Sequence, residues 1–186
     1  FKWNKTAGMD AMQFKDQMSA GNSVKSNDNN WAVDTNTFEF TTDKGTAYIV
    51  DIDIESVYSP LNKQFKLEEI ECEIDFSTNN NTKQGDLRYM AATNKHEQYA
   101  VMATISDILI TWVNEWDEEL YIDKIIVDPI KDEGDDSYGD RTDNKRGRLY
   151  HAFMKKQVPK FNKQYHVRVF DNHFEISPRF INPKDK

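Results

Sequence analysis

The chain has 186 residues, which is enough for one domain with a well-formed core and short for two. A composition of 38% hydrophobic and 30% charged residues is typical of a polar globular protein and argues against wholesale disorder. The formal net charge of −8 argues against a sequence-independent grip on nucleic acid, and the single cysteine excludes an intramolecular disulfide. No run approaches the roughly 18 apolar residues of a membrane span, so we expect a soluble, intracellular protein.

The first 35 residues predict an N-terminal arm. Its first part, "FKWNKTAGMDAMQFKDQMSA", spaces apolar residues irregularly enough for a weak amphipathic helix. The next part, "GNSVKSNDNNWAVDTN", is rich in Asn, Ser and Gly, which is typical of a loop. The arm either binds a partner protein or packs its helix on the chain's own sheet, and the second interpretation is favoured. A single α/β domain then covers residues 36–186.

Three strands with period-two alternation open this domain. Phe38 and Phe40 face one way before the turn "TTDKG", whose glycine suits a positive φ. The segments "AYIVDIDIE" and "EEIECEIDF" each place apolar residues on one face and carboxylates on the other. Together they predict an antiparallel meander with one buried face, in which Cys72 is a buried thiol.

Helical periodicity marks residues 98–116 as the central helix. "ELYIDKIIVDP" predicts a buried strand, residues 143–158 a second helix that ends at Pro159, and "YHVRVFDNHFEIS" a hairpin on an Asp171-Asn172 turn. From residue 37 onward the predicted order is three strands, a helix, a strand, a helix and two strands. This order predicts an α/β (α+β) domain with a mixed, mainly antiparallel sheet and helices on its faces.

This order resembles the core of the GNAT-type N-acyltransferases over about residues 36–177. "IDKIIVDP" is similar to the strand after the central helix of that family, and "RGRLYHAFMKK" to the next helix, which often carries a Leu-Tyr pair. The resemblance implies acyl transfer from acetyl-coenzyme A or another acyl-coenzyme A to an amine. It implies Tyr150 as the general acid that protonates the leaving thiolate. The general base is implied to be Glu73, among the strand carboxylates Glu71, Glu73 and Asp75.

A second resemblance lies at the entry to the central helix. "TNKHEQYAVMATI" is similar to the helix entry of small uncharacterised proteins of tailed bacteriophages, which implies a phage-encoded protein in the host cytoplasm or in the virion. The acyltransferases need glycines in this loop so that backbone N–H groups can approach the pyrophosphate. Asn94 and His96 stand in their place here. We therefore expect a degenerate coenzyme A loop, in which binding can persist without catalysis.

The same entry has two interpretations from its residues alone. Helix N–H groups, Lys95 and a protonated His96 could meet a phosphate, which makes Asn94, Lys95, His96 and Glu97 the candidate cofactor-binding residues. Alternatively Thr93 or Asn94 caps the helix and Glu97 closes a capping box. The second interpretation is favoured because Glu97 would repel the same anion.

Other polar clusters have ordinary explanations beside their functional ones. Asp51, Asp53 and Glu55 share one strand face and could approach a divalent ion, but such carboxylates are more often solvated or form an acidic face for a basic partner. No third ligand at a recognisable spacing joins His166 and His173, so we predict no metal site.

The segment "NKRGRLYHAFMKK" either binds phosphate groups or is a basic surface helix, and the surface helix is favoured. The alternative to the acyltransferase is a non-enzymatic interaction or virion-associated protein. Such a protein would hold a protein partner with its acidic sheet face and its N-terminal arm. Whether the chain is an enzyme stays open at this point.

Overall fold

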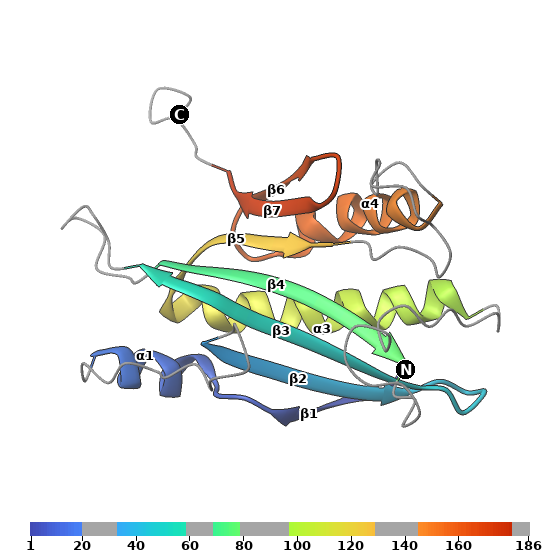
Figure 1. Cartoon of the computed structure of the whole chain (residues 1–186), viewed down its shortest axis with the longest axis horizontal. Coiled ribbons are helices and arrows are strands. Elements are labelled where there is room, and N and C mark those ends of the chain that lie inside the picture. Colours follow the sequence, from blue (N-terminus) through green and yellow to red (C-terminus); the bar gives the residue numbers. More distant parts are fainter. Residues whose placement is uncertain (20–32, 59–68, 79–96, 129–144, 180–186) are drawn as a thin grey trace.

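The computed structural model describes residues 1–19, 33–58, 69–78, 97–128 and 145–179, and all structural statements concern these residues. They form one seven-stranded sheet with the strand order β1-β2-β3-β4-β5-β7-β6. In Figure 1 this order runs from β1 at the bottom to β6 at the top. Of the six strand pairs in these residues, β4 and β5 make the one parallel pair. The prediction of a mixed, mainly antiparallel sheet is confirmed.

The predicted meander corresponds to β2 (Asp34–Thr41), β3 (Ala47–Tyr58) and β4 (Glu69–Thr78). Its apolar alternation is buried as expected, and Cys72 is fully buried among these side chains. The turn between β2 and β3 has a φ of +79° at Gly45, and the Gly45 N–H donates to the Thr42 carbonyl. A left-handed backbone of this kind favours glycine because it has no Cβ.

The remaining predicted elements also form, in the predicted order. α3 (Gln98–Glu119) carries the chain from β4 to β5 (Tyr121–Val127), and α4 (Lys145–Gln157) follows β5. A short 3-10 turn, η1 (Val158–Lys160), ends that helix at Pro159. The last hairpin consists of β6 (Tyr165–Val169) and β7 (Phe174–Pro178), and β7 lies between β5 and β6.

The segment predicted as an arm contributes two elements to this unit. β1 (Trp3–Ala7) pairs antiparallel with β2 at the sheet edge, and the sequence patterns did not predict this strand. α1 (Ala11–Ser19) is the expected short helix. Its Phe14 is fully buried with its ring 5.3 Å from that of Trp116 in α3, and Lys15 pairs with Glu119 at 2.7 Å. The N-terminal residues therefore pack on the domain.

The three helices pack on one face of the sheet rather than on both, because α1 and α4 each contact α3 and all share one core. Trp112 and Trp116 are the largest buried side chains of that core. Burying an aromatic or aliphatic side chain contributes about 1.5–3 kcal/mol. In the described part of the chain no helix covers the other face, which we call the open face. None of the described helices is both long and apolar enough to cross a membrane.

Candidate functional site

The parallel pair opens at one end. β4 and β5 are paired from Glu69 with Tyr121 to Ile74 with Val127, and beyond that point β4 continues to Thr78. In the described residues, positions 75–78 of β4 therefore pair with β3 alone. We call the space beside these four residues the β4–β5 notch.

The start of α3 and the second turn of α4 lie near the notch. Glu97, the residue before α3, accepts a hydrogen bond at 3.3 Å from the backbone N–H of Lys44 in the β2–β3 turn, and this turn lies beside the end of β4. In α4, the ring of Tyr150 lies 5.3 Å from that of Phe76 in β4. Because β4 and β5 are parallel, the helices that follow them both begin at this edge of the sheet.

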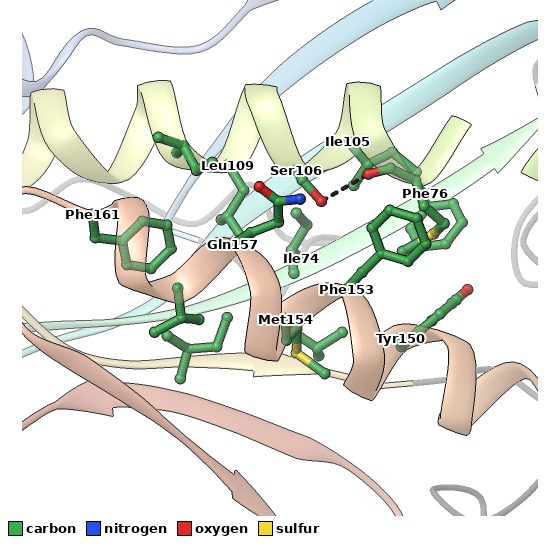
Figure 2. Close-up of a pocket in the computed structure, with 15 residues that line it drawn as sticks. Ile74, Phe76, Ile105, Ser106, Leu109, Tyr150, Phe153, Met154, Gln157 and Phe161 are labelled. Atoms are coloured by element: carbon green, nitrogen blue, oxygen red, sulfur yellow. Dashed lines mark hydrogen bonds between the residues drawn. The ribbon is translucent and has the colours of Figure 1, made fainter. Parts of the chain in front are cut away.

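An apolar cavity of about 40 Å³ lies beneath the notch, on the helix side. Side chains of β4, α3 and α4 surround it, and Figure 2 shows α3 and α4 on its two sides. Tyr150 is 7% exposed and lies with Phe76 and Phe153 at one end, while Phe161 lies at the other end (Figure 2). Ser106 is one of its few polar neighbours, and its hydroxyl donates to the Met102 carbonyl at 2.7 Å.

On the open face, carboxylates of neighbouring strands stand directly opposite one another. Asp51 of β3 faces Asp75 of β4, and Asp53 faces Glu73. Like charges in such positions repel, so each pair raises the free energy of the ionised state. Hydroxyls of β2 offset part of this cost, because Thr37 donates to Asp51 at 2.8 Å and a Thr35 hydroxyl donates to Asp53.

The two β4 carboxyls beside the notch hold protons at unusually high pH. Burial raises the pKa of Glu73 to about 7, and repulsion from Glu55, Asp128 and Asp53 adds to the effect of burial. Burial also raises the pKa of Asp75 to about 8, with repulsion from Glu73 as the next cause. A carboxyl that titrates near neutral pH can accept a proton from a substrate and release it again.

The structure places the two predicted catalytic residues on opposite sides of the sheet. Glu73 points to the open face, whereas Tyr150 packs on the helix side against Phe76, so they do not touch. The notch lies between them. Of the predicted cofactor-binding residues, Asn94, Lys95 and His96 lie outside the described residues.

Glu97 has a different position from the one a capping box requires. It is the N-cap residue of α3, with φ −105° and ψ 6°, and its side chain makes no cap hydrogen bond. The capping box predicted for Glu97 places it at the third position inside the helix, so that interpretation is wrong. The carboxylate binds the β2–β3 turn instead.

The sequence did not predict the facing carboxylate pairs or the cavity. Alternating acids in two consecutive strands were visible, but the register that sets Asp51 against Asp75 depends on a turn whose geometry the alternation does not fix. In the described part of the chain, no group of three or more His, Cys, Asp or Glu residues is arranged to hold a metal ion. The ring of His151 instead stacks on Phe174 at 5.5 Å.

Comparison of the chain with protein-family models, with curated proteins and with solved structures found no match.

Proposed function

We propose that the chain is an acyltransferase-like protein that binds an acyl-coenzyme A thioester at the β4–β5 notch and can pass the acyl group to an amine. The observation that carries the proposal is the notch itself. β4 and β5 point the same way, stop pairing at Ile74 and Val127, and are each followed by a helix that begins at the same edge. In open sheets, ligands bind in such a crevice beyond the carboxyl ends of parallel strands.

The residues around the notch fit an extended thioester arm. Residues 75–78 of β4 present a strand edge, and an extended ligand can hydrogen-bond to such an edge as an added strand does. The cavity below is far smaller than the roughly 300–1,000 Å³ of drug-sized ligand sites. At about 40 Å³ it has room for a short acyl group and not for the whole arm. An acyl-coenzyme A supplies the acyl group in activated form.

The roles of Glu73 and Tyr150 follow from their positions on opposite sides of the sheet. Glu73 takes a proton from the amine on the open face, and the amine nitrogen then bonds to the carbonyl carbon. The carbon–sulfur bond breaks, and Tyr150 on the helix side gives its proton to the leaving thiolate. Because the pKa of Glu73 is about 7, this carboxyl is ready to accept a proton at neutral pH.

Thermal unfolding with acetyl-coenzyme A tests binding. A ligand that binds only the folded state at 100 times its Kd stabilises the protein by about 2.7 kcal/mol. We expect the melting temperature to rise by roughly 5–10 °C for a domain of this size. ATP, which has the phosphates and adenine without the thioester arm, should give a smaller rise. No shift at millimolar acetyl-coenzyme A contradicts the proposal.

Two substitutions test catalysis. We expect Glu73→Gln and Tyr150→Phe each to lower kcat/KM for acyl transfer about 10²–10⁴-fold, because each removes one proton transfer. The wild-type kcat/KM should rise with pH through about 7, since Glu73 must be ionised, and the Gln variant should lack this limb. Glu39→Gln is the control, because Glu39 is an exposed carboxylate of β2, which is separated from β4 by β3. Full activity of Tyr150→Phe would remove Tyr150 from the mechanism.

A non-enzymatic interaction protein is the second proposal. The facing pairs Asp51–Asp75 and Asp53–Glu73 favour it, because a basic partner protein would neutralise repulsion that the fold otherwise bears. The resemblance to tailed-phage proteins supports a virion-associated partner of this kind. The first proposal predicts stabilisation by acetyl-coenzyme A, whereas the second predicts none.

A further inference from the structure

A polar hollow lies on the open face, away from the notch cavity. It has a volume of about 560 Å³ and is lined by side chains of β5, β6 and β7 and by Phe170 after β6. Sites for small molecules commonly have volumes of roughly 300–1,000 Å³. The charged residues of its lining are Asp123, Lys124, His166, Arg168 and Glu175.

Among the described residues, the two strong cations of this hollow have only long contacts with carboxylates. The Lys124 ammonium lies 3.5 Å from Glu71, and the Arg168 guanidinium lies 4.0 Å from Glu175. Charge-assisted hydrogen bonds are usually about 2.7–2.9 Å long. Glu175 lies closer to His173, at 3.2 Å, and the Arg168 side chain is 56% exposed. Lys124 and Arg168 can therefore accept a further anionic group.

Other features make the hollow suited to an organic ligand rather than a free inorganic anion. Two carboxylates, Asp123 and Glu175, also line it, and they would repel a multiply charged anion. The Arg168 guanidinium lies 5.3 Å from the centre of the Phe170 ring, which holds the guanidinium over that ring. Among the described residues, the Nδ1 atom of His166 is buried without a hydrogen-bond partner.

On the open face, β4 presents the acids Glu71 and Glu73, whereas β5, β7 and β6 present a mixed set of charges with the cations Lys124 and Arg168. Glu71 of β4 stands opposite Lys124, and Glu73 stands opposite Ile126, which in turn faces Glu175 of β7. Neighbouring strands are about 4.8 Å apart, so β4 and β7 are separated by about 10 Å. A ligand with an anionic end between Lys124 of β5 and Arg168 of β6, and a cationic end over β4, would match this pattern.

We propose that the hollow binds a basic amino acid of the lysine type, with its α-carboxylate at Lys124 and Arg168, its α-ammonium at Asp123 and its side-chain amine toward Glu71 and Glu73. An extended lysine side chain separates its amine from its carboxylate by roughly 7 Å, which spans one to two strand spacings. The site deepens the proposed function and rests on it in one respect. If the notch holds a thioester, the side-chain amine beside Glu73 is the acceptor.

Calorimetric titration of the protein without any coenzyme tests this site by itself. L-Lysine is compared with cadaverine, which lacks the carboxylate, and with norleucine, which lacks the side-chain amine. We expect each analogue to bind at least tenfold more weakly than lysine. Equal binding of cadaverine overturns the role of the carboxylate, and tighter binding of inorganic phosphate overturns the amino-acid class.

Variants connect this binding to the named residues. We expect Arg168→Gln and Lys124→Gln each to weaken lysine binding about tenfold or more, and to weaken cadaverine binding little. Lys160→Gln is the matched control, because Lys160 is exposed in η1 and does not line the hollow. Melting temperatures of all variants show that they fold. Unchanged lysine affinity in both hollow variants overturns the proposal.

The outcomes separate this site from the proposed acyl transfer. If Arg168→Gln removes lysine binding and acetyl-coenzyme A does not stabilise the protein, the lysine site in the hollow is supported and the proposed acyl transfer is rejected. If acetyl-coenzyme A stabilises the protein but lysine binds no better than cadaverine, coenzyme binding at the notch is supported and the lysine site in the hollow is rejected.

Discussion

At the scale of single residues, the open face is marked by carboxylates placed against each other. Asp51 faces Asp75 and Asp53 faces Glu73 across β3 and β4. Burial keeps water from screening their repulsion, so the folded protein retains protons that an unfolded chain would release. The stability of the protein should therefore depend on pH in an unusual direction.

Asp75→Asn tests this dependence. The pKa of Asp75 is raised from 3.8 to about 8, so between these values the folded state binds more protons than the unfolded state. The free energy of unfolding therefore falls as the pH rises from about 4, and the loss is complete near pH 8. We expect Asp75→Asn to be about 1–3 kcal/mol more stable than the wild type at pH 9, after allowance for partial exposure, with no gain at pH 3–4.

Urea denaturation at a series of pH values measures the effect. Glu39→Gln changes an exposed carboxylate on the same face and should show the pH dependence of the wild type. An Asp75→Asn variant that is less stable than the wild type at pH 9 would show that the ionised carboxylate has a stabilising partner.

At the scale of elements, the connection between β1 and α1 depends on Gly8. Its φ is +93°, and a Cβ there would lie 2.4 Å from the Thr35 carbonyl oxygen and 2.7 Å from the Cα of Asn36. The backbone of β2 leaves no room for a side chain at this point. Next to it, the Met9 N–H donates to Asp34 at 3.1 Å, which fixes the start of α1 on the same strand.

Gly8→Ala and Gly45→Ala form a matched pair that separates contact from conformation. Both glycines have a positive φ, but a Cβ at Gly45 meets nothing within 4 Å. We expect Gly45→Ala to cost about 1–2 kcal/mol from backbone strain alone. Gly8→Ala should cost about 2–5 kcal/mol, because the overlap with β2 adds to the strain. Equal losses in chemical denaturation would show that β1 and α1 move away from β2 at little cost.

The missed strand shows what the residues of an element can and cannot predict. In β3 the alternation of Ile52 and Ile54 with acids predicted the strand and its buried face correctly. In β1, four of the five residues are exposed, so no alternation is present to find. β1 forms a strand because it pairs with the edge of β2. Its partner residues lie 30 or more positions away, so the sequence of β1 alone carries no pattern that predicts a strand.

At the scale of the whole molecule, the N-terminal residues pack on the central helix. Phe14 is fully buried against Trp116, and Trp3 donates its indole N–H to Asp107 of α3 at 2.7 Å. These contacts join the first 19 residues to the central helix. The sequence predicted the helix and favoured its packing within the chain, but it did not predict the contacts with α3.

Phe14→Ala tests this attachment. We expect it to lower the free energy of unfolding by about 3–5 kcal/mol, because it leaves a cavity beside Trp116. Met12→Ala on the same helix should change it by less than about 0.5 kcal/mol, since Met12 is 57% exposed. Tryptophan fluorescence during denaturation should show one transition for both variants. An early separate transition in Phe14→Ala would show that α1 unfolds by itself.

Much of the fold was predictable because periodicity reports burial, and the elements from residue 37 onward form in the predicted order. The candidate site was predictable only in part. Glu73 and Tyr150 were proposed from a resemblance and stay predictions, whereas their positions on opposite sides of the sheet and the hollow at Arg168 depend on strand order and register. Strand order and register depend on how distant segments pair, so the pattern within a single segment does not predict them.

The parallel pair also has a consequence for how the chain reaches its native state. Glu69 pairs with Tyr121, 52 positions later, whereas β3 and β4 belong to a meander of consecutive strands. Closing the longer loop costs more entropy, and non-local pairs form slowly. We expect the meander to form first and β5 to dock on it late. The notch and the hollow both include residues beside or within β5, so we expect neither place to be complete until this late step has taken place.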